Sequence, residues 1–89
     1  MKTKLILIFT MLAMTTQVYA KKSCTTQPKS EWMSESDFKA RMEKEGSQIS
    51  KFKQPGTCYE IYGKNPQGKK VEVYFNPVNA EVVKSKLDN

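Results

Sequence analysis

Hydrophobic and polar residues alternate strictly in two runs near the middle of the chain, 59–62 and 71–75. Alternation with a period of two is typical of strands that bury one face. The apolar face of these strands would carry Tyr59, Ile61, Val71, Val73 and Phe75. The opposite face would carry Glu60, Tyr62, Glu72 and Tyr74. The pattern therefore predicts two half-buried strands.

The segment between the two runs, residues 65–69, reads N-P-Q-G-K and predicts a β-hairpin. Pro66 presets the first loop residue, and Gly68 can take the left-handed conformation that closes a three-residue loop. A loop of that length places Ile61 opposite Val73, whereas a loop of two or four residues would pair apolar with acidic residues. The same register predicts three further pairs: Tyr59 with Phe75, Tyr62 with Glu72, and Glu60 with Tyr74.

A helix over residues 35–45 is predicted from its two ends and its apolar spacing. Ser34 can cap the first turn, where acidic residues also favour the positive end of the helix. Phe38 and Met42 share one side at a spacing of four residues, and Gly46 is a natural terminator. A helix this short is marginal in water, so we expect its apolar side to pack on the apolar face of the hairpin.

Two weaker strands complete the predicted sheet. Residues 48–54 have the lysines of an edge strand. However, Ile49 and Phe52 would fall on opposite faces of a regular strand. Residues 76–80 form a turn that leads into a short last strand at 81–84. The predicted fold class is α+β, with one N-terminal helix packed on a four-stranded antiparallel β-meander as a two-layer sandwich.

The first 20 residues have the composition of a signal peptide. Two lysines form the basic start, an apolar run follows at 5–14, and residues 18–20 read V-Y-A, a small-residue cleavage site. The apolar run is shorter than the roughly 20 residues needed to span a bilayer. We expect an exported, periplasmic or secreted protein that begins at Lys21 and keeps no integral membrane segment.

Cys24 and Cys58 are the two cysteines of the chain, and an even pair in an exported protein is typical of a disulfide. The bond would tether an irregular N-terminal arm at 21–33 to a single domain at 34–86. Because Cys58 has the parity of Glu60, we expect the arm at the polar face of the sheet or its edge. Closing a loop of about 35 residues contributes about 4 kcal/mol in the chain-entropy account.

Two stretches of the chain resemble the PepSY domain, particularly its small exported single-domain form. They are E-G-S-Q-I-S-K-F-K at 45–53 and C-Y-E-I-Y-G-K-N-P-Q-G-K-K-V-E-V-Y-F-N-P-V-N-A-E-V-V at 58–83. The resemblance covers about Trp32 to Lys84. It implies a non-enzymatic domain related to propeptide segments of secreted zinc metallopeptidases, where inhibition or chaperoning of a peptidase has been proposed.

The last turn departs from the family pattern, because Asn79 and Ala80 stand where the family has Thr-Gly. The four-residue loop of the family would place Ala80 in a left-handed conformation that alanine tolerates poorly, and would turn Val82 inward. If Asn79 takes the left-handed position instead, Lys84 pairs with Glu72. Both alternatives are open at the level of the sequence.

The chain contains no histidine, which removes the commonest general base and the commonest metal ligand. Glu60 and Glu72 share a face, but among lysines on an open sheet we expect a solvated cross-strand ladder rather than a catalytic carboxylate pair. Met33 and Met42 are explained by helix packing rather than by Cu(I) binding. We therefore predict no catalytic residue, no metal and no cofactor.

Tyrosines among charged residues on an open sheet face suit protein recognition better than catalysis. The alternative is a soluble outer face that the arm covers. Trp32 would either anchor a partner or cover the start of the helix. The candidate partner-binding residues are Glu60, Tyr62, Glu72, Tyr74 and Trp32.

The predicted function is to bind and modulate a protein partner, with an exported peptidase and a membrane redox protein as candidates. Without Lys2 and Lys4 the chain carries 13 basic and nine acidic residues, a net charge of +4. This charge is modest and forms no basic stripe, so nucleic acid is not a predicted partner. We expect a monomer or weak dimer. The alternative function is that of a small-ligand or metal-binding periplasmic protein.

Overall fold

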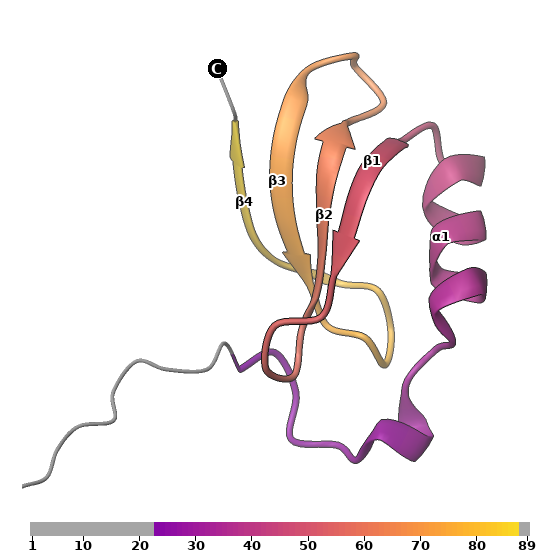
Figure 1. The fold of residues 1–89 in the computed structure, drawn as a ribbon, viewed down its shortest axis with the longest axis vertical. Coiled ribbons are helices and arrows are strands. Elements are labelled where there is room, and N and C mark those ends of the chain that lie inside the picture. The colour runs from indigo at the N-terminus through magenta and orange to yellow at the C-terminus, as the bar shows by residue number, and fades with distance from the viewer. Residues whose placement is uncertain (1–22, 88–89) are drawn as a thin grey trace, which may run out of the picture.

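The computed structural model describes residues 23–87 and contains one sheet and one α-helix. The elements are α1 (Glu35–Lys44), β1 (Gln48–Lys53), β2 (Tyr59–Lys64), β3 (Lys70–Phe75) and β4 (Val82–Leu87). The strands pair antiparallel in the order β1-β2-β3-β4, and α1 stands at the β1 end of this row (Figure 1). The predicted α+β class with a four-stranded antiparallel sheet is confirmed. The predicted signal peptide at 1–20 lies outside the described residues.

The hairpin of β2 and β3 has the predicted three-residue loop. The Asn65 N–H donates to the Lys69 carbonyl at 2.9 Å, and the Gly68 N–H donates to the Asn65 carbonyl at 2.8 Å. Gly68 is left-handed, with a φ of 81°, which its missing side chain permits. The Asn65 side chain accepts two more bonds from loop amides, both at 3.0 Å. All four predicted cross-strand pairs are confirmed.

Phe38 of α1 is the centre of the core. Its ring is fully buried and lies 5.0 Å from the rings of Tyr59 and Phe75 and 6.0 Å from that of Phe52. Met42, one turn later on the same side of α1, is also buried. The helix therefore packs its predicted apolar side against the apolar face of the strands.

Both predicted ends of α1 are confirmed to within one residue. The Ser34 side chain accepts a hydrogen bond from the Asp37 N–H at 3.1 Å, as an N-cap does. At the other end Gly46 has a φ of 105° and donates its N–H to the Glu43 carbonyl at 3.0 Å. These contacts satisfy backbone groups that the ends of a short helix would otherwise expose.

A β-bulge in β1 resolves the conflict between Ile49 and Phe52. The register shifts after Ile49, so that Ile49 pairs with Gly63 and Phe52 pairs with Ile61. Both apolar side chains therefore pack against the core. At the bulge, β1 runs so close to β2 that a Cβ on Gly63 would lie 1.8 Å from the Gln48 carbonyl oxygen.

The last turn follows the four-residue alternative, in which Ala80 is left-handed with a φ of 64°. The Asn76 N–H donates to the Glu81 carbonyl and the Ala80 N–H donates to the Asn76 carbonyl, both at 2.8 Å. The Asn79 side chain accepts from the Glu81 N–H at 3.0 Å. These bonds hold alanine in a conformation that it disfavours by itself.

This turn sets the register of β4. Val82 lies on the core side of the sheet, and Lys84 lies opposite Tyr74 after a register shift at the start of the strand. The alternative pairing of Lys84 with Glu72 is therefore wrong. The strand is also longer than predicted and runs to Leu87.

The predicted disulfide between Cys24 and Cys58 is confirmed, with the two Cα atoms 5.0 Å apart. The arm is less irregular than predicted, because it contains a short 3-10 helix at Lys29–Glu31. At its far end the Met33 N–H donates to the Pro77 carbonyl at 2.8 Å. The described part of the arm is thus held to the sheet at both ends.

We expect Gly63→Ala to lower the free energy of unfolding by about 3 kcal/mol, because its Cβ would overlap a backbone oxygen that cannot move without displacing β1. Gly68→Ala is the matched control: its Cβ would meet nothing within 4 Å, so only the left-handed conformation is penalised. Denaturant unfolding measures both. A cost at Gly63 no larger than that at Gly68 would contradict the close approach.

Reduction of the disulfide should lower the melting temperature by more than about 10 °C, since the bond closes a long loop and each kcal/mol moves a domain of this size by roughly 4–8 °C. Calorimetry with and without a thiol reductant measures the shift. The double variant Cys24→Ala with Cys58→Ala serves as the control, because reductant must leave it unchanged. If reduction hardly changes the melting temperature of the unmodified protein, the disulfide contributes little to its stability.

Candidate functional site

Two rows of side chains cross all four strands on the face opposite α1, and each row begins and ends with a lysine. Residues directly opposite in neighbouring strands point to the same face, so the registers define both rows. The first row is Lys51, Tyr62, Glu72 and Lys86. The second row is Lys53, Glu60, Tyr74 and Lys84. We call these eight residues the lysine-edged face.

Glu72 is the acceptor at the centre of this face. The hydroxyls of Tyr62 and Tyr74 both donate to its Oε2, each at 3.1 Å. Its Oε1 lies 3.5 Å from Nζ of Lys86. Only 14% of the Glu72 side chain is exposed. The carboxylate is therefore held in place from three sides by donors of its own face.

Glu60 is buried, and the expectation of a solvated carboxylate ladder is wrong for it. The residue is 3% exposed, and its Oε2 has no hydrogen-bond donor within reach among the described residues. A charged carboxylate with one unpaired oxygen is costly to bury, so the neutral form is favoured. Burial raises the pKa of Glu60, and a hydrogen bond with the Glu72 carboxyl raises it further.

At pH values between their two pKa values, the two carboxyls share a single proton. The hydrogen bond from Glu60, followed by those from Tyr74 and Tyr62, lowers the pKa of Glu72 to about 2 against the cost of its own desolvation. Because the pKa of Glu60 is raised at the same time, the proton resides on Glu60 and the charge on Glu72. The pair therefore carries one negative charge from about pH 2 up to the raised pKa of Glu60.

The tyrosines remain protonated donors beside this pair. A hydrogen bond with Glu60, together with desolvation, raises the pKa of Tyr62 to about 12. Burial and a hydrogen bond with Glu72 raise the pKa of Tyr74 as well. The Tyr62 ring also lies between two β1 lysines, with Nζ of Lys51 at 5.3 Å and Nζ of Lys53 at 5.5 Å from its centroid. Those contacts place two cations over a half-buried aromatic ring.

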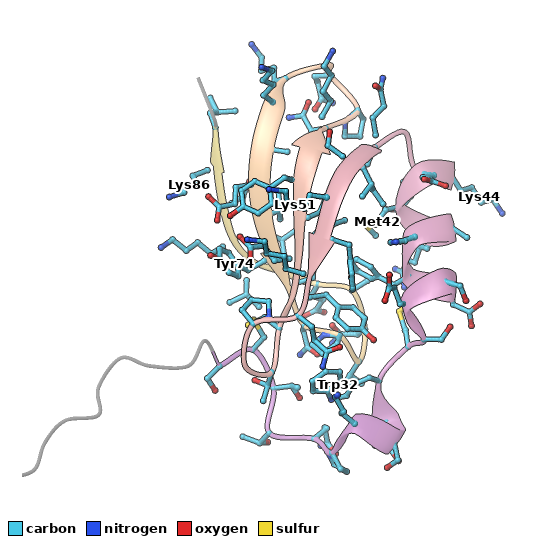
Figure 2. The ribbon with its side chains drawn as sticks, viewed as in Figure 1. Trp32, Met42, Lys44, Lys51, Tyr74 and Lys86 are labelled. Carbon is cyan, nitrogen blue, oxygen red and sulfur yellow. A yellow bond between two sulfur atoms is a disulfide. The ribbon has the colours of Figure 1, made fainter. Side chains whose placement is uncertain are left out.

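Trp32 does not join the other four predicted partner-binding residues. Its ring packs edge-on against Tyr59, on the core side of the sheet, with centroids 5.7 Å apart. The indole N–H donates to the Gln27 carbonyl at 3.1 Å. Figure 2 shows Trp32 at the lower end of the molecule, apart from Lys51 and Tyr74. In this position Trp32 covers the end of the core next to α1.

Lys51, Lys53 and Lys86 were not expected on this face, and Lys84 was expected there only in the alternative that paired it with Glu72. Lys51 and Lys53 were visible as edge-strand lysines, but the bulge in β1 decides which tyrosine and glutamate they face. Lys84 and Lys86 depend on the register shift in β4. The sequence does carry one sign of this arrangement. Lys51 and Lys53 are two residues apart, as are Lys84 and Lys86, and this spacing puts both members of a pair on the same face of a strand.

Two carboxyls whose pKa values are pushed apart resemble an acid and base pair of an enzyme. A substrate would have to reach them, however, and Glu60 is almost completely buried. A hollow of about 250 Å³ on the core side and one of about 220 Å³ beside Lys64 and Lys70 are lined by residues other than Glu60 and Glu72. Neither of these two hollows therefore reaches the carboxyl pair.

Residues 23–87 contain no cluster of three metal-binding acidic, cysteine or histidine side chains. Within the same residues, no helix has the length and apolar character needed to cross a bilayer.

Comparison with known families matches residues 4–86 to the PepSY family described as "Peptidase propeptide and YPEB domain". The matched residues include α1, the sheet up to Lys86 and the whole lysine-edged face. No curated protein and no solved structure matches the chain. The resemblance inferred from residues 45–53 and 58–83 is confirmed.

The shared proton predicts how stability changes with pH. Above the ordinary glutamate pKa of about 4.3 the native state holds a proton that the unfolded chain has released, so stability falls as pH rises through the raised pKa of Glu60. The slope reaches at most about 1.4 kcal/mol per pH unit for one proton. With no histidine in the chain, few other groups titrate between pH 5 and 8.

We expect Glu60→Gln to remove this decline, because the amide keeps a donor for Glu72 and cannot ionise. Urea unfolding at a series of pH values measures the change, with Glu43→Gln on the exposed side of α1 as the control. The control should keep the decline of the unmodified protein. Parallel stability profiles for Glu60→Gln and the unmodified protein would mean that Glu60 is already ionised in the native state.

Proposed function

Because the chain belongs to the PepSY family of peptidase propeptide and YPEB domains, we propose that it is a non-enzymatic exported module that binds and modulates a protein partner. In this proposal residues 1–20 are a signal peptide and residues 21–33 are an arm tethered by the disulfide. Residues 34–86 form one two-layer unit of helix on sheet. The disulfide supports a periplasmic or secreted location, since such bonds persist in oxidising compartments.

The observation that carries the proposal is the lysine-edged face. Four lysines surround two carboxyls, so the face is positive overall even when both carboxyls are ionised. Its half-buried tyrosines offer flat rings whose hydroxyls are already directed inward by Glu72. Aromatic rings between long cationic side chains are common in protein interfaces.

The charge of this face determines the kind of surface that it recognises. Opposite charges steer association and exclude partners of like charge, so the complementary surface is acidic. The family description makes a peptidase the first partner to test. A membrane redox protein is the second.

The proposed binding is tested with the oxidised protein as bait in periplasmic extract, and with the peptidase activity of each retained protein as the readout. The variant Lys51→Glu with Lys53→Glu reverses the charge of one edge of the face and leaves Glu60 and Glu72 unsubstituted. The variant Lys44→Glu with Lys69→Glu makes the same change of charge on α1 and in the hairpin loop. Both variants are first checked for an unchanged melting temperature.

We expect the unmodified protein and the control variant to retain the same partner and to change its peptidase activity. The face variant should bind at least about tenfold more weakly, a loss of about 1.4 kcal/mol. If the unmodified protein, the face variant and the control variant all retain the partner equally, the lysine-edged face is not the binding surface. A retained partner whose activity is unaffected by the bound domain would contradict modulation.

A further inference from the structure

The strand β4 is an open edge with an unusual surface. Of the described residues, the exposed large hydrophobic ones are Val82, Val83 and Leu87, exposed by 59%, 52% and 57%, and all three lie on β4. The opposite edge, β1, stands next to α1, whereas β4 lies at the far end of the row of strands (Figure 1). The register shift of β4 lies at its start, so its pairing with β3 is regular from Lys84 to Leu87. An edge strand presents unpaired backbone N–H and C=O groups, so β4 is a template for another strand.

An apolar hollow of about 250 Å³ adjoins this edge on the core side. It lies between α1 and the outer strands, with Met42, Val73, Phe75 and Val82 among its lining residues. Ser85 stands opposite Val73 and also lines the hollow. Because serine is small, the hollow stays open towards the edge in the middle of β4. A bulky apolar side chain on an added strand, placed beside Ser85, would reach into it.

The other face of β4 is basic. Lys84 and Lys86 belong to the lysine-edged face, on either side of Ser85 in the sequence. A second copy of this chain is a poor occupant, because an antiparallel pairing of two β4 strands centred on Ser85 places lysines directly opposite lysines. The complementary strand has an acidic residue beside each lysine and an apolar residue between the two acids.

We propose that β4 accepts an extended segment of a partner protein as a fifth strand, with the pattern acidic, apolar, acidic. The two acidic side chains lie beside Lys84 and Lys86, and the apolar side chain enters the hollow beside Ser85. Backbone bonds to the edge supply affinity, and the alternation of charge and hollow supplies specificity. Lys84 and Lys86 also belong to the lysine-edged face, so this site extends the proposed partner surface to the edge of the sheet. The proposed function is tested at Lys51 and Lys53 on β1, so the failure of one proposal can be distinguished from the failure of the other.

The test uses a synthetic peptide with a central Glu-Leu-Glu flanked by alternating threonine and valine. Two matched peptides replace the centre by Lys-Leu-Lys or by Glu-Ser-Glu, which change the charge or the apolar side chain alone. Binding to isotope-labelled oxidised protein, expressed from the full chain, is followed by NMR shifts and by amide hydrogen exchange. Glu-Leu-Glu should bind at least about tenfold more tightly than either control and should protect amides of β4.

Reversing the charges of the β4 lysines gives a stricter test of charge recognition. In the variant Lys84→Glu with Lys86→Glu the preference should move to Lys-Leu-Lys, whereas Lys44→Glu with Lys69→Glu should keep the original preference. Figure 2 shows Lys44 on the opposite side of the molecule from Lys86. If the double variant does not fold, Lys84→Glu alone leaves the contact of Lys86 with Glu72 in place and should still weaken Glu-Leu-Glu binding.

Three results would overturn the proposal. Equal binding of the three peptides would show that β4 does not select this pattern. Shifts centred on Lys51 and Lys53 would assign the peptide to the sheet face instead. The third result is a protein that sediments as a dimer and shows protected β4 amides without peptide. That result would mean that a second copy of the chain pairs with β4.

Discussion

The three-residue loop between β2 and β3 is the constraint on which the rest of the structure depends. The bond between Asn65 and Lys69 and the left-handed Gly68 allow one register, and that register decides which side chains face α1. A slip of one residue would turn one strand over relative to the other, so that apolar residues would face acidic residues and Ile61 would pair with Glu72. Phe38 can be fully buried because the loop places apolar side chains of both strands on its side of the sheet.

The same register creates an electrostatic problem on the other face, where two glutamates lie among tyrosines in two adjacent strands. Below the raised pKa of Glu60 the two carboxyls share one proton, so that Glu60 is a neutral donor and Glu72 is the acceptor for both phenols. The lysines of β1 and β4 then outnumber the remaining charge. The proposed partner surface is therefore basic although its centre is built from acids, and the β4 lysines continue it to the edge of the sheet.

The features that could be predicted from the sequence are those with local causes. The hairpin, the Ser34 cap and the cysteine pair each depend on a few neighbouring residues or on one pairing rule. The features that could not be predicted arise from packing over the whole sheet. The bulge in β1 is the cost of burying both Ile49 and Phe52, and the burial of Glu60 requires the two tyrosines above the sheet plane. Similarly, Trp32 is drawn to Tyr59 at the end of the core, which its position in an irregular arm does not reveal.

The most direct test of this account is a carbon NMR titration of the glutamate carboxyl groups in the folded, oxidised protein. The account predicts that Glu72 is already ionised at about pH 3 and that Glu60 changes state above the ordinary glutamate value of about 4.3. It also predicts that each signal reports the titration of the other, as expected of a coupled pair. Two independent titrations near the ordinary value would show two separate solvated carboxylates, and would contradict a shared proton beneath the lysine-edged face.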